Sequence, residues 1–408
     1  MRKENLSLVI TGHIDHGKST LIGRLLLETN SLTKDRILEI KKIAQELGRE
    51  AELAFLTDQL REEREKSMTI DTTQIFFKSA KRNYTIIDSP GHVEFIKNML
   101  TGASLAEAAI LIVDVTEGIR DQTRRHAFII NMLGMESLIV AVNKMDRVNF
   151  KREPFEEVKA ELLKFLEALK MKADFIIPIS AREGANITKK DRRLNWYKGP
   201  TLLAGLNSFR PLLPSPRKPL RFPIQDIYEI KGEKMVVGRL LSGRLKEGEE
   251  VMLYPSLEEV RVNSLKIFER NLKKAYAGEN VAIILDRPFL AKRGLVMAKK
   301  ENPPQVCSNF KANLFWLSEE PLAVKQFFTF RCATQEVNCQ IKKIEKRIDS
   351  STLEIIAENC PTLKLNETGI VVIETEKPVV IEKFHFIEEL GRFVLEENQE
   401  LKGAGIIT

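Results

Sequence analysis

The sequence is poor in cysteine, in aromatic residues and in long apolar runs. Its four cysteines all lie in the last third of 408 residues, and none forms the CxxC pair typical of zinc or redox sites. We therefore expect buried, reduced thiols. No apolar run reaches the roughly 20 residues that span a membrane, and the start, MRKENLSLVITG, does not resemble a signal peptide. These absences predict a cytoplasmic protein with no membrane partner.

Charge is plentiful but mixed in sign. Lys and Arg number 64 against 57 Asp and Glu, which gives a formal net charge of +7. Such an excess suits an anionic partner, such as a nucleotide or a nucleic acid. Because Lys and Glu are interspersed, as in EEREK and KKIEKR, a solvated surface is the alternative interpretation.

The first half of the chain alternates short apolar runs with longer amphipathic stretches. The runs are LSLVI, QIFF, YTII, AILIV, LIVAV and FIIPI. This pattern predicts an α/β domain over residues 1–208, with a mostly parallel six-stranded sheet and helices on both faces. Residues 35–48 carry apolar residues at helical spacing before Gly48, so we expect an inserted helix there.

The second half of the chain has a different sequence pattern. Residues 210–223 hold five prolines, which predicts a stiff linker. Short alternating strands follow, and they predict a β-barrel domain over residues 216–301 and a second one over residues 302–408. The expected turns of the first barrel lie at Lys231-Gly232, Ser242-Gly243, Glu247-Gly248 and Ala277-Gly278.

A glycine-rich motif follows the first apolar run. Residues 12–19 fit GxxxxGK[ST] between a predicted strand and a predicted helix, which is the context of a phosphate-binding P-loop. Lys18 is expected to reach the β- and γ-phosphates and Ser19 to bind Mg²⁺. The expected nucleotide contacts in this segment are Gly12, His13, Ile14, Asp15, His16, Gly17, Lys18, Ser19 and Thr20.

A second motif, DSPGH, follows the run YTII. Asp88 is expected to hold magnesium through water, and Gly91, next to Pro90, to donate its N–H to the γ-phosphate. In isolation the motif is also compatible with an ordinary turn. Its position after a predicted strand favours the nucleotide interpretation.

Two further segments point to guanine as the base. In Asn143-Lys144-Met145-Asp146, after LIVAV, the Asp146 carboxylate is placed to accept hydrogen bonds from N1–H and the 2-amino group of guanine. Ser180-Ala181, after FIIPI, is expected to contact the guanine oxygen through its backbone. All these motifs follow predicted strands, where α/β sheets bind ligands. The sequence therefore predicts an α/β P-loop GTPase domain that binds GTP or GDP with Mg²⁺.

With these motifs the sequence resembles the translational GTPase superfamily of elongation factor Tu and elongation factor 1-alpha. Residues 58–71, ending in EREKSMTID, are similar to the first switch segment of that group, although Glu62–Lys66 are also compatible with a solvated helix. The resemblance implies that Thr69 closes on Mg²⁺ and the γ-phosphate. Ser67 and Met68 replace the usual glycine and isoleucine, which affects the apolar gate that Met68 would form with Ile14.

The resemblance also implies the catalytic residues. His92 would position the attacking water, and Lys18 and Thr69 would complete the catalytic set. His13 and His16 are expected to have supporting roles.

Within the superfamily, several stretches resemble the GTPase subunits of sulfate adenylyltransferase. They are residues 16–26, 98–104, 124–126, 196–202 and 315–322. This resemblance implies a regulatory GTPase that forms a hetero-oligomer with a small catalytic adenylyltransferase subunit and couples GTP hydrolysis to adenylylsulfate synthesis. The alternatives are an elongation-factor-like GTPase that delivers aminoacyl-tRNA, to which the form of residues 12–16 is closer, and a GTPase serving another partner.

Overall fold

The computed structural model describes residues 4–32, 73–88, 106–135, 137–209, 215–230, 233–267, 270–286, 292–352 and 354–408. The chain divides into two compact units, Met1–Pro211 and Leu212–Thr408, and the division falls in the proline-rich segment. The domain limits at 208, 216 and 301 stay predictions.

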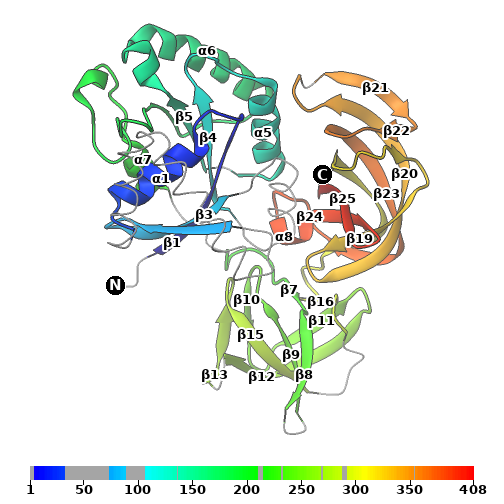
Figure 1. The fold of residues 1–408 in the computed structure, drawn as a ribbon. Coiled ribbons are helices and arrows are strands. Elements are labelled where there is room, and N and C mark those ends of the chain that lie inside the picture. Colours follow the sequence, from blue (N-terminus) through cyan, green and yellow to red (C-terminus); the bar gives the residue numbers. More distant parts are fainter. Residues whose placement is uncertain are drawn as a thin grey trace. The chain divides into compact units, whose positions relative to one another are not determined.

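The first unit is an α/β layer structure (Figure 1). Its strands are β1 (Glu4–Gly12), β2 (Thr73–Lys78), β3 (Arg82–Asp88), β4 (Ala108–Asp114), β5 (Ser137–Asn143) and β6 (Phe175–Pro178). Its helices are α1 (Lys18–Glu28), α5 (Asp121–Met132), α6 (Arg152–Ala168) and α7 (Leu202–Ser208), with 3-10 turns at Met145–Val148 and Arg192–Leu194.

The six strands form one sheet in the order β2-β3-β1-β4-β5-β6. Only β2 runs antiparallel to its neighbour, and the other pairs are parallel. Every residue of β4 is buried, which explains its unbroken apolar sequence, because a central parallel strand is covered on both faces. The predicted six-stranded sheet is therefore confirmed.

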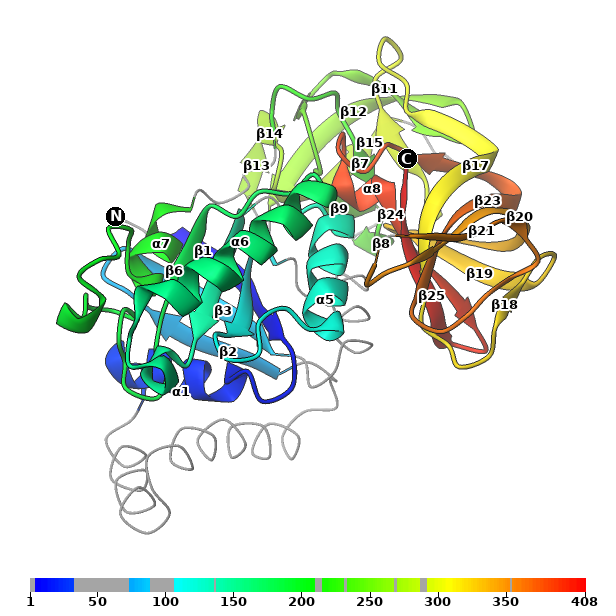
Figure 2. The same cartoon turned by 90° about the horizontal axis from the view of Figure 1, so that it is seen from above.

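Helices cover both faces of this sheet, as expected. One core joins Leu8 and Ile10 of β1 to apolar residues of α1 and α7. Val9 lies between them, is fully buried, and points to the opposite face because strand side chains alternate. Figures 1 and 2 show α5 and α6 on that other side. The inserted helix expected at residues 35–48 lies outside the described residues.

The second unit begins with a β-barrel-type domain. Its strands are β7 (Phe222–Pro223), β8 (Asp226–Ile230), β9 (Glu233–Arg239), β10 (Arg244–Lys246), β11 (Glu250–Tyr254), β12 (Glu258–Ile267), β13 (Arg270–Leu272), β14 (Lys274–Tyr276), β15 (Asn280–Leu285) and β16 (Val296–Ala298). Gly243, Gly248 and Gly278 lie between strands with φ of +79°, +79° and +94°. The turns predicted at these glycines are confirmed, because such φ values favour glycine.

The second barrel-type domain is all-β apart from one short helix, α8 (Glu388–Gly391). Its strands are β17 (Gln305–Trp316), β18 (Leu322–Ala323), β19 (Phe327–Cys332), β20 (Gln335–Asp349), β21 (Ile355–Cys360), β22 (Thr362–Leu363), β23 (Glu367–Ile381), β24 (Arg392–Glu397) and β25 (Glu400–Ile407). The sheet order is β19-β24-β25-β17-β23-β20-β21, and β19 also pairs with β20. That extra pairing closes six strands into a barrel, whose core contains Trp316 and Phe330.

The two barrels of this unit share a small core and a buried ion pair. Residues of β11 and β16 pack with Val380, Ile387 and Leu390. Arg221 Nε and Nη2 both lie 2.7 Å from Glu382 Oε1, and both residues are buried. Arg221 Nη1 also donates to the carbonyl oxygen of Asn302 at 2.9 Å. This arginine therefore ties strand β7 to the segment that opens the second barrel.

We expect the substitution Arg221→Met to lower the free energy of unfolding by about 3–5 kcal/mol, because it leaves Glu382 buried without a cation. Denaturant unfolding of the full chain measures the change. The matched control is Arg261→Met, which breaks an exposed 2.6 Å pair with Glu250 and should shift the unfolding midpoint little. Equal shifts for the two variants would contradict the proposed importance of the buried pair.

The cysteines agree with the prediction of free thiols. Cys332, Cys339 and Cys360 are buried, Cys307 is half-buried, and none forms a disulfide. Burial raises the pKa of Cys332 and of Cys339 to about 12, so both are protonated at neutral pH. Within the described ranges, no helix is both long enough and apolar enough to span a membrane.

Candidate functional site

A cavity of about 470 Å³ lies at the carboxyl ends of β1, β5 and β6. Its described lining residues are Asp15, Gly17, Lys18, Ser19, Thr20, Asn143, Lys144, Asp146, Arg147 and Arg182. Three segments far apart in the sequence therefore meet here, and each follows a strand of the sheet. The position agrees with the general rule that open α/β sheets bind ligands beyond the carboxyl ends of their strands.

The loop between β1 and α1 depends on two glycines. A side chain at Gly12, where φ is +154°, would put its Cβ 2.4 Å from the Ile112 carbonyl oxygen. At Gly17, where φ is +95°, the Cβ would lie 2.5 Å from Asn143 Nδ2. The backbone thus approaches its neighbours as closely as only glycine allows.

The same loop gathers groups that bind anions. Lys18 Nζ donates to the carbonyl oxygens of Gly12 and His13, both at 2.8 Å, so its charge lies inside the loop. Gly17 is the N-cap of α1 and has no side chain with which to cap the first N–H groups of this helix. A cationic ammonium and a helix N-terminus at one loop are suited to a phosphate group.

The two histidines of the loop are held in place from α5 and β4. His13 Nδ1 lies 2.7 Å from Gln122 Oε1. His16 is fully buried, and its Nδ1 lies 3.3 Å from the backbone nitrogen of Asp114. Burial lowers the pKa of His16, which therefore stays neutral at pH 7. A neutral, buried ring is consistent with the supporting role expected for this residue.

Asn143 joins the three segments around the cavity. Its Nδ2 donates to the His16 carbonyl oxygen, and its Oδ1 accepts from the Ala181 N–H, both at 2.9 Å. Both bonds are buried, so losing either leaves a polar group without a partner. Asn143 therefore sets the distance between the phosphate loop and the segment at Ser180-Ala181.

Asp146 lies on the cavity wall and is oriented by a neighbour. The Ser180 hydroxyl donates to its Oδ1 at 2.5 Å, and Ser180 itself is fully buried. This contact was not predicted from the sequence, which assigned only a backbone role to Ser180. A carboxylate fixed in this way can present its other oxygen to a donor in the cavity.

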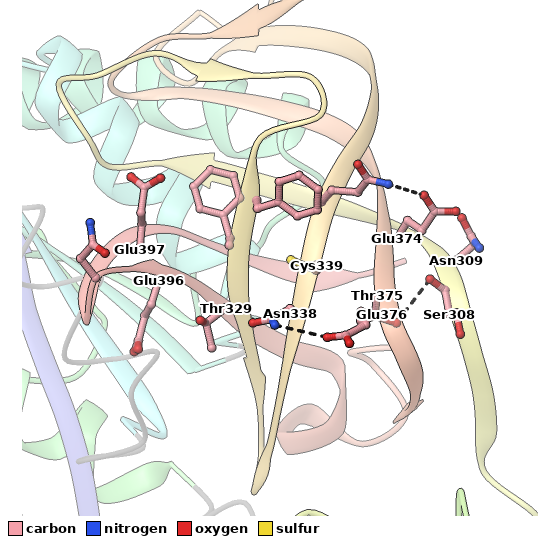
Figure 3. Close-up of a pocket in the computed structure, with 14 residues that line it drawn as sticks. Ser308, Asn309, Thr329, Asn338, Cys339, Glu374, Thr375, Glu376, Glu396 and Glu397 are labelled. Carbon is pink, nitrogen blue, oxygen red and sulfur yellow. Dashed lines mark hydrogen bonds between the residues drawn. The ribbon is translucent and has the colours of Figure 1, made fainter.

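A larger cavity of about 830 Å³ lies in the second barrel, and Figure 3 shows its side chains. Four glutamates line it, namely Glu374, Glu376, Glu396 and Glu397, and none of the described lining residues is Lys or Arg. Carboxylates repel a polyphosphate, whereas Lys18, Lys144, Arg147 and Arg182 attract one. The smaller cavity is therefore the candidate nucleotide site.

Known proteins match this architecture along the whole chain. The family model "Elongation factor Tu GTP binding domain" matches residues 3–244, "Elongation factor Tu domain 2" matches residues 234–286, and "GTP-eEF1A C-terminal domain-like" matches residues 309–408. The chain belongs to the translational GTPase superfamily. It is a GTP-binding switch with a P-loop GTPase domain followed by two β-barrel domains.

Two similar relatives are proteins named elongation factor 1-alpha. The chain is 40% identical to elongation factor 1-alpha of Archaeoglobus fulgidus, over 99% of this chain and 97% of the relative. It is 38% identical to elongation factor 1-alpha of Pyrococcus woesei, over the same shares. Among solved structures, the match to sup35 complexed with GDP covers 100% of this chain and 94% of the sup35 chain. The two sequences are 23% identical, and the TM-score is 0.46.

These relatives show that the assignment to sulfate adenylyltransferase was wrong. Two of the stretches that suggested it, residues 196–202 and 315–322, carry side chains that pack within the fold, whereas residues 98–104 lie outside the described residues. The Trp196 indole donates to the Phe150 carbonyl oxygen at 3.0 Å and packs beside Phe155. Phe315 and Trp316 are buried in the second barrel, where Trp316 Nε1 donates to the Glu320 carbonyl oxygen. Buried residues of this kind are explained by packing and do not identify a partner.

Helix α1 carries contacts that sequence reasoning missed in this translational GTPase. Arg24 Nε donates to the Ala181 carbonyl oxygen at 3.0 Å, and Glu28 Oε2 accepts from the Thr188 hydroxyl at 2.5 Å. The helix that begins at the phosphate loop thus also holds residues 180–188, called the base-side segment because they include the predicted guanine contacts Ser180 and Ala181. An Arg and a Glu four residues apart look like an ordinary surface pair in sequence, so no local signal marks them.

Thr69, Pro90, Gly91 and His92 lie outside the described residues, as do Ser67 and Met68. Asp88 is the last residue of β3, which runs parallel to β1. It therefore lies at the same edge of the sheet as the phosphate loop.

Proposed function

We propose that this chain is an elongation factor that carries aminoacyl-tRNA in its GTP-bound form and hydrolyses GTP to release it. The similarity to proteins named elongation factor 1-alpha, at 38–40% identity over 99% of the chain, is the observation that carries this proposal. The net charge of +7 supports a nucleic-acid partner.

In this proposal the nucleotide occupies the cavity of the first unit. Lys18 and the backbone N–H groups of residues 12–20 bind the phosphates, Asp146 pairs with the guanine edge, and Ser180-Ala181 contact the guanine oxygen. Asn143 holds the base-side segment in place through the Ala181 N–H, and Lys144 lines the cavity. A Cβ at Gly12 or at Gly17 would collide with Ile112 or with Asn143. This close packing supports a loop whose backbone can lie next to the phosphates.

Magnesium fits the donor set proposed beside the γ-phosphate. Ser19 and Thr69 offer hydroxyl oxygens and Asp88 a carboxylate, and these hard ligands suit Mg²⁺, which usually takes few protein ligands in addition to phosphates and water. The bound ion would neutralise charge that develops on the phosphates during hydrolysis. His92, Lys18 and Thr69 are the proposed catalytic residues, with His92 orienting the attacking water.

The experiment for this function measures binding of aminoacyl-tRNA to the full chain loaded with GDP or with a non-hydrolysable GTP analogue. We expect sub-micromolar affinity in the GTP state and binding weaker by at least about tenfold in the GDP state, because the two states differ in their contacts to the ligand. Deacylated tRNA is the control for charge alone. Equal binding of both tRNAs in both states, or no binding, would refute the delivery function and point to another partner.

We expect the substitution His92→Ala to lower the rate of GTP hydrolysis by about 100-fold while GTP affinity stays within several-fold, because water positioning acts in the transition state. Single-turnover hydrolysis and equilibrium titration separate the two effects. His385→Ala, at an exposed histidine of the second barrel, is the control and should change neither quantity. An unchanged hydrolysis rate in His92→Ala would remove the catalytic assignment.

A further inference from the structure

Asp114 is a buried carboxylate beside the nucleotide cavity that belongs to none of the motifs. It is the last residue of β4, with a side-chain exposure of 0%, and it lies opposite Asn143 in the register with β5. A carboxylate in such a place is costly unless charges and hydrogen bonds compensate for the lost water. The groups that compensate the Asp114 charge therefore indicate the role of this residue.

One carboxylate oxygen accepts hydrogen bonds, and the other lies beside two cations. Its Oδ1 accepts from the backbone N–H and from the hydroxyl of Thr116, both at 2.8 Å. Its Oδ2 lies 2.7 Å from Lys144 Nζ and 3.9 Å from Arg147 Nη1. Burial acts to raise the pKa of Asp114, but the bonds from Lys144 and Thr116 outweigh it, and the pKa lies below its usual value. Asp114 is therefore ionised at neutral pH.

Both cations that face Asp114 come from the nucleotide cavity. Lys144 and Arg147 line it, and the Lys144 side chain is 16% exposed. Lys144 also has a φ of +63°, a left-handed conformation that a non-glycine residue keeps only when its surroundings stabilise it. On the other side, the Asp114 backbone nitrogen lies 3.3 Å from His16 Nδ1 in the phosphate loop. Asp114 thus contacts both halves of the cavity.

We propose that Asp114 is a positioning residue for the nucleotide, because its carboxylate holds Lys144 and so fixes residues 143–147 against the phosphate loop. The inference rests on the proposed nucleotide function of the cavity. Its consequence is kinetic as well as thermodynamic, since holding residues 143–147 in place slows the release of bound GDP.

The test compares full-length variants by equilibrium titration and stopped-flow release of a fluorescent GDP. Asp114→Asn keeps the shape and an acceptor for Thr116 but removes the charge that pairs with Lys144. We expect its Kd for GDP to rise by about tenfold, mainly through faster dissociation. Asp174→Asn is the matched control, because that exposed carboxylate accepts from the Leu138 N–H near the opposite end of β5. It should leave the Kd unchanged.

Lys144→Met and the double variant distinguish positioning from a general loss of stability. If Asp114 acts through Lys144, adding Asp114→Asn to Lys144→Met weakens GDP binding no further. Additive losses would overturn the proposal, as would a lower melting temperature of Asp114→Asn with an unchanged Kd. Wild-type protein that binds no guanine nucleotide would refute the proposed function and this inference together, whereas unchanged binding by Asp114→Asn would refute only the inference.

Discussion

The substitution Asp146→Asn is expected to weaken GTP binding by about 1,000-fold or more and to create a preference for xanthine nucleotides. A site built to accept hydrogen bonds from both N1–H and the 2-amino group of guanine can no longer accept both when an amide replaces the carboxylate, because the amide NH2 then faces a donor of the base. The amide can instead match the altered edge of xanthine. Competition titration of the variant with GTP and XTP measures the exchange of specificity.

The structure makes this substitution a clean test. Asp146 Oδ1 accepts a hydrogen bond from the Ser180 hydroxyl, and an asparagine oxygen can keep that bond. The base-side segment should therefore stay in place, and the melting temperature without nucleotide should change little. Tight GTP binding with no gain for XTP would show that Asp146 does not read the base.

The substitution Gly17→Ala is expected to lower nucleotide affinity by at least about 100-fold, since it combines an unfavourable backbone with a collision. The added Cβ would lie 2.5 Å from Asn143 Nδ2, at a φ of +95°. Asn143 cannot move aside without losing its bonds to the His16 carbonyl and the Ala181 N–H. Titration with GDP measures the loss.

The control substitution Gly248→Ala distinguishes the steric collision of a new Cβ from the cost of a positive φ in a residue other than glycine. Gly248 also has a positive φ, +79°, but a Cβ there would meet nothing within 4 Å. It lies in a turn of the first barrel, so its substitution should lower stability modestly and leave nucleotide affinity unchanged. If Gly17→Ala behaved like Gly248→Ala, the close packing of the phosphate loop would have no part in binding.

Local pattern was sufficient to predict the elements that position the site. The runs that became β1, β4 and β5 are apolar because most of their residues are buried, and the last two residues of β6 are buried as well. This signal is visible within a few residues. The turn glycines at Gly243 and Gly248 were found for the same reason, since a positive φ restricts the residue type locally. The partner was not predicted correctly, because the stretches at Trp196 and Phe315 encode packing and not recognition.

What the sequence by itself determined is therefore the GTPase fold, the two barrels and the residue types placed at the ends of the strands. Only the tertiary structure decided how those residues are held. Asn143 forms hydrogen bonds with His16 and Ala181, Arg24 donates a hydrogen bond to Ala181, and the buried Asp114 pairs with Lys144. Each of these contacts joins residues from different elements, up to 157 positions apart in the chain. Such pairs leave no periodic trace in a single sequence, because the folding of the sheet, and not the neighbouring residues, brings them within hydrogen-bonding distance.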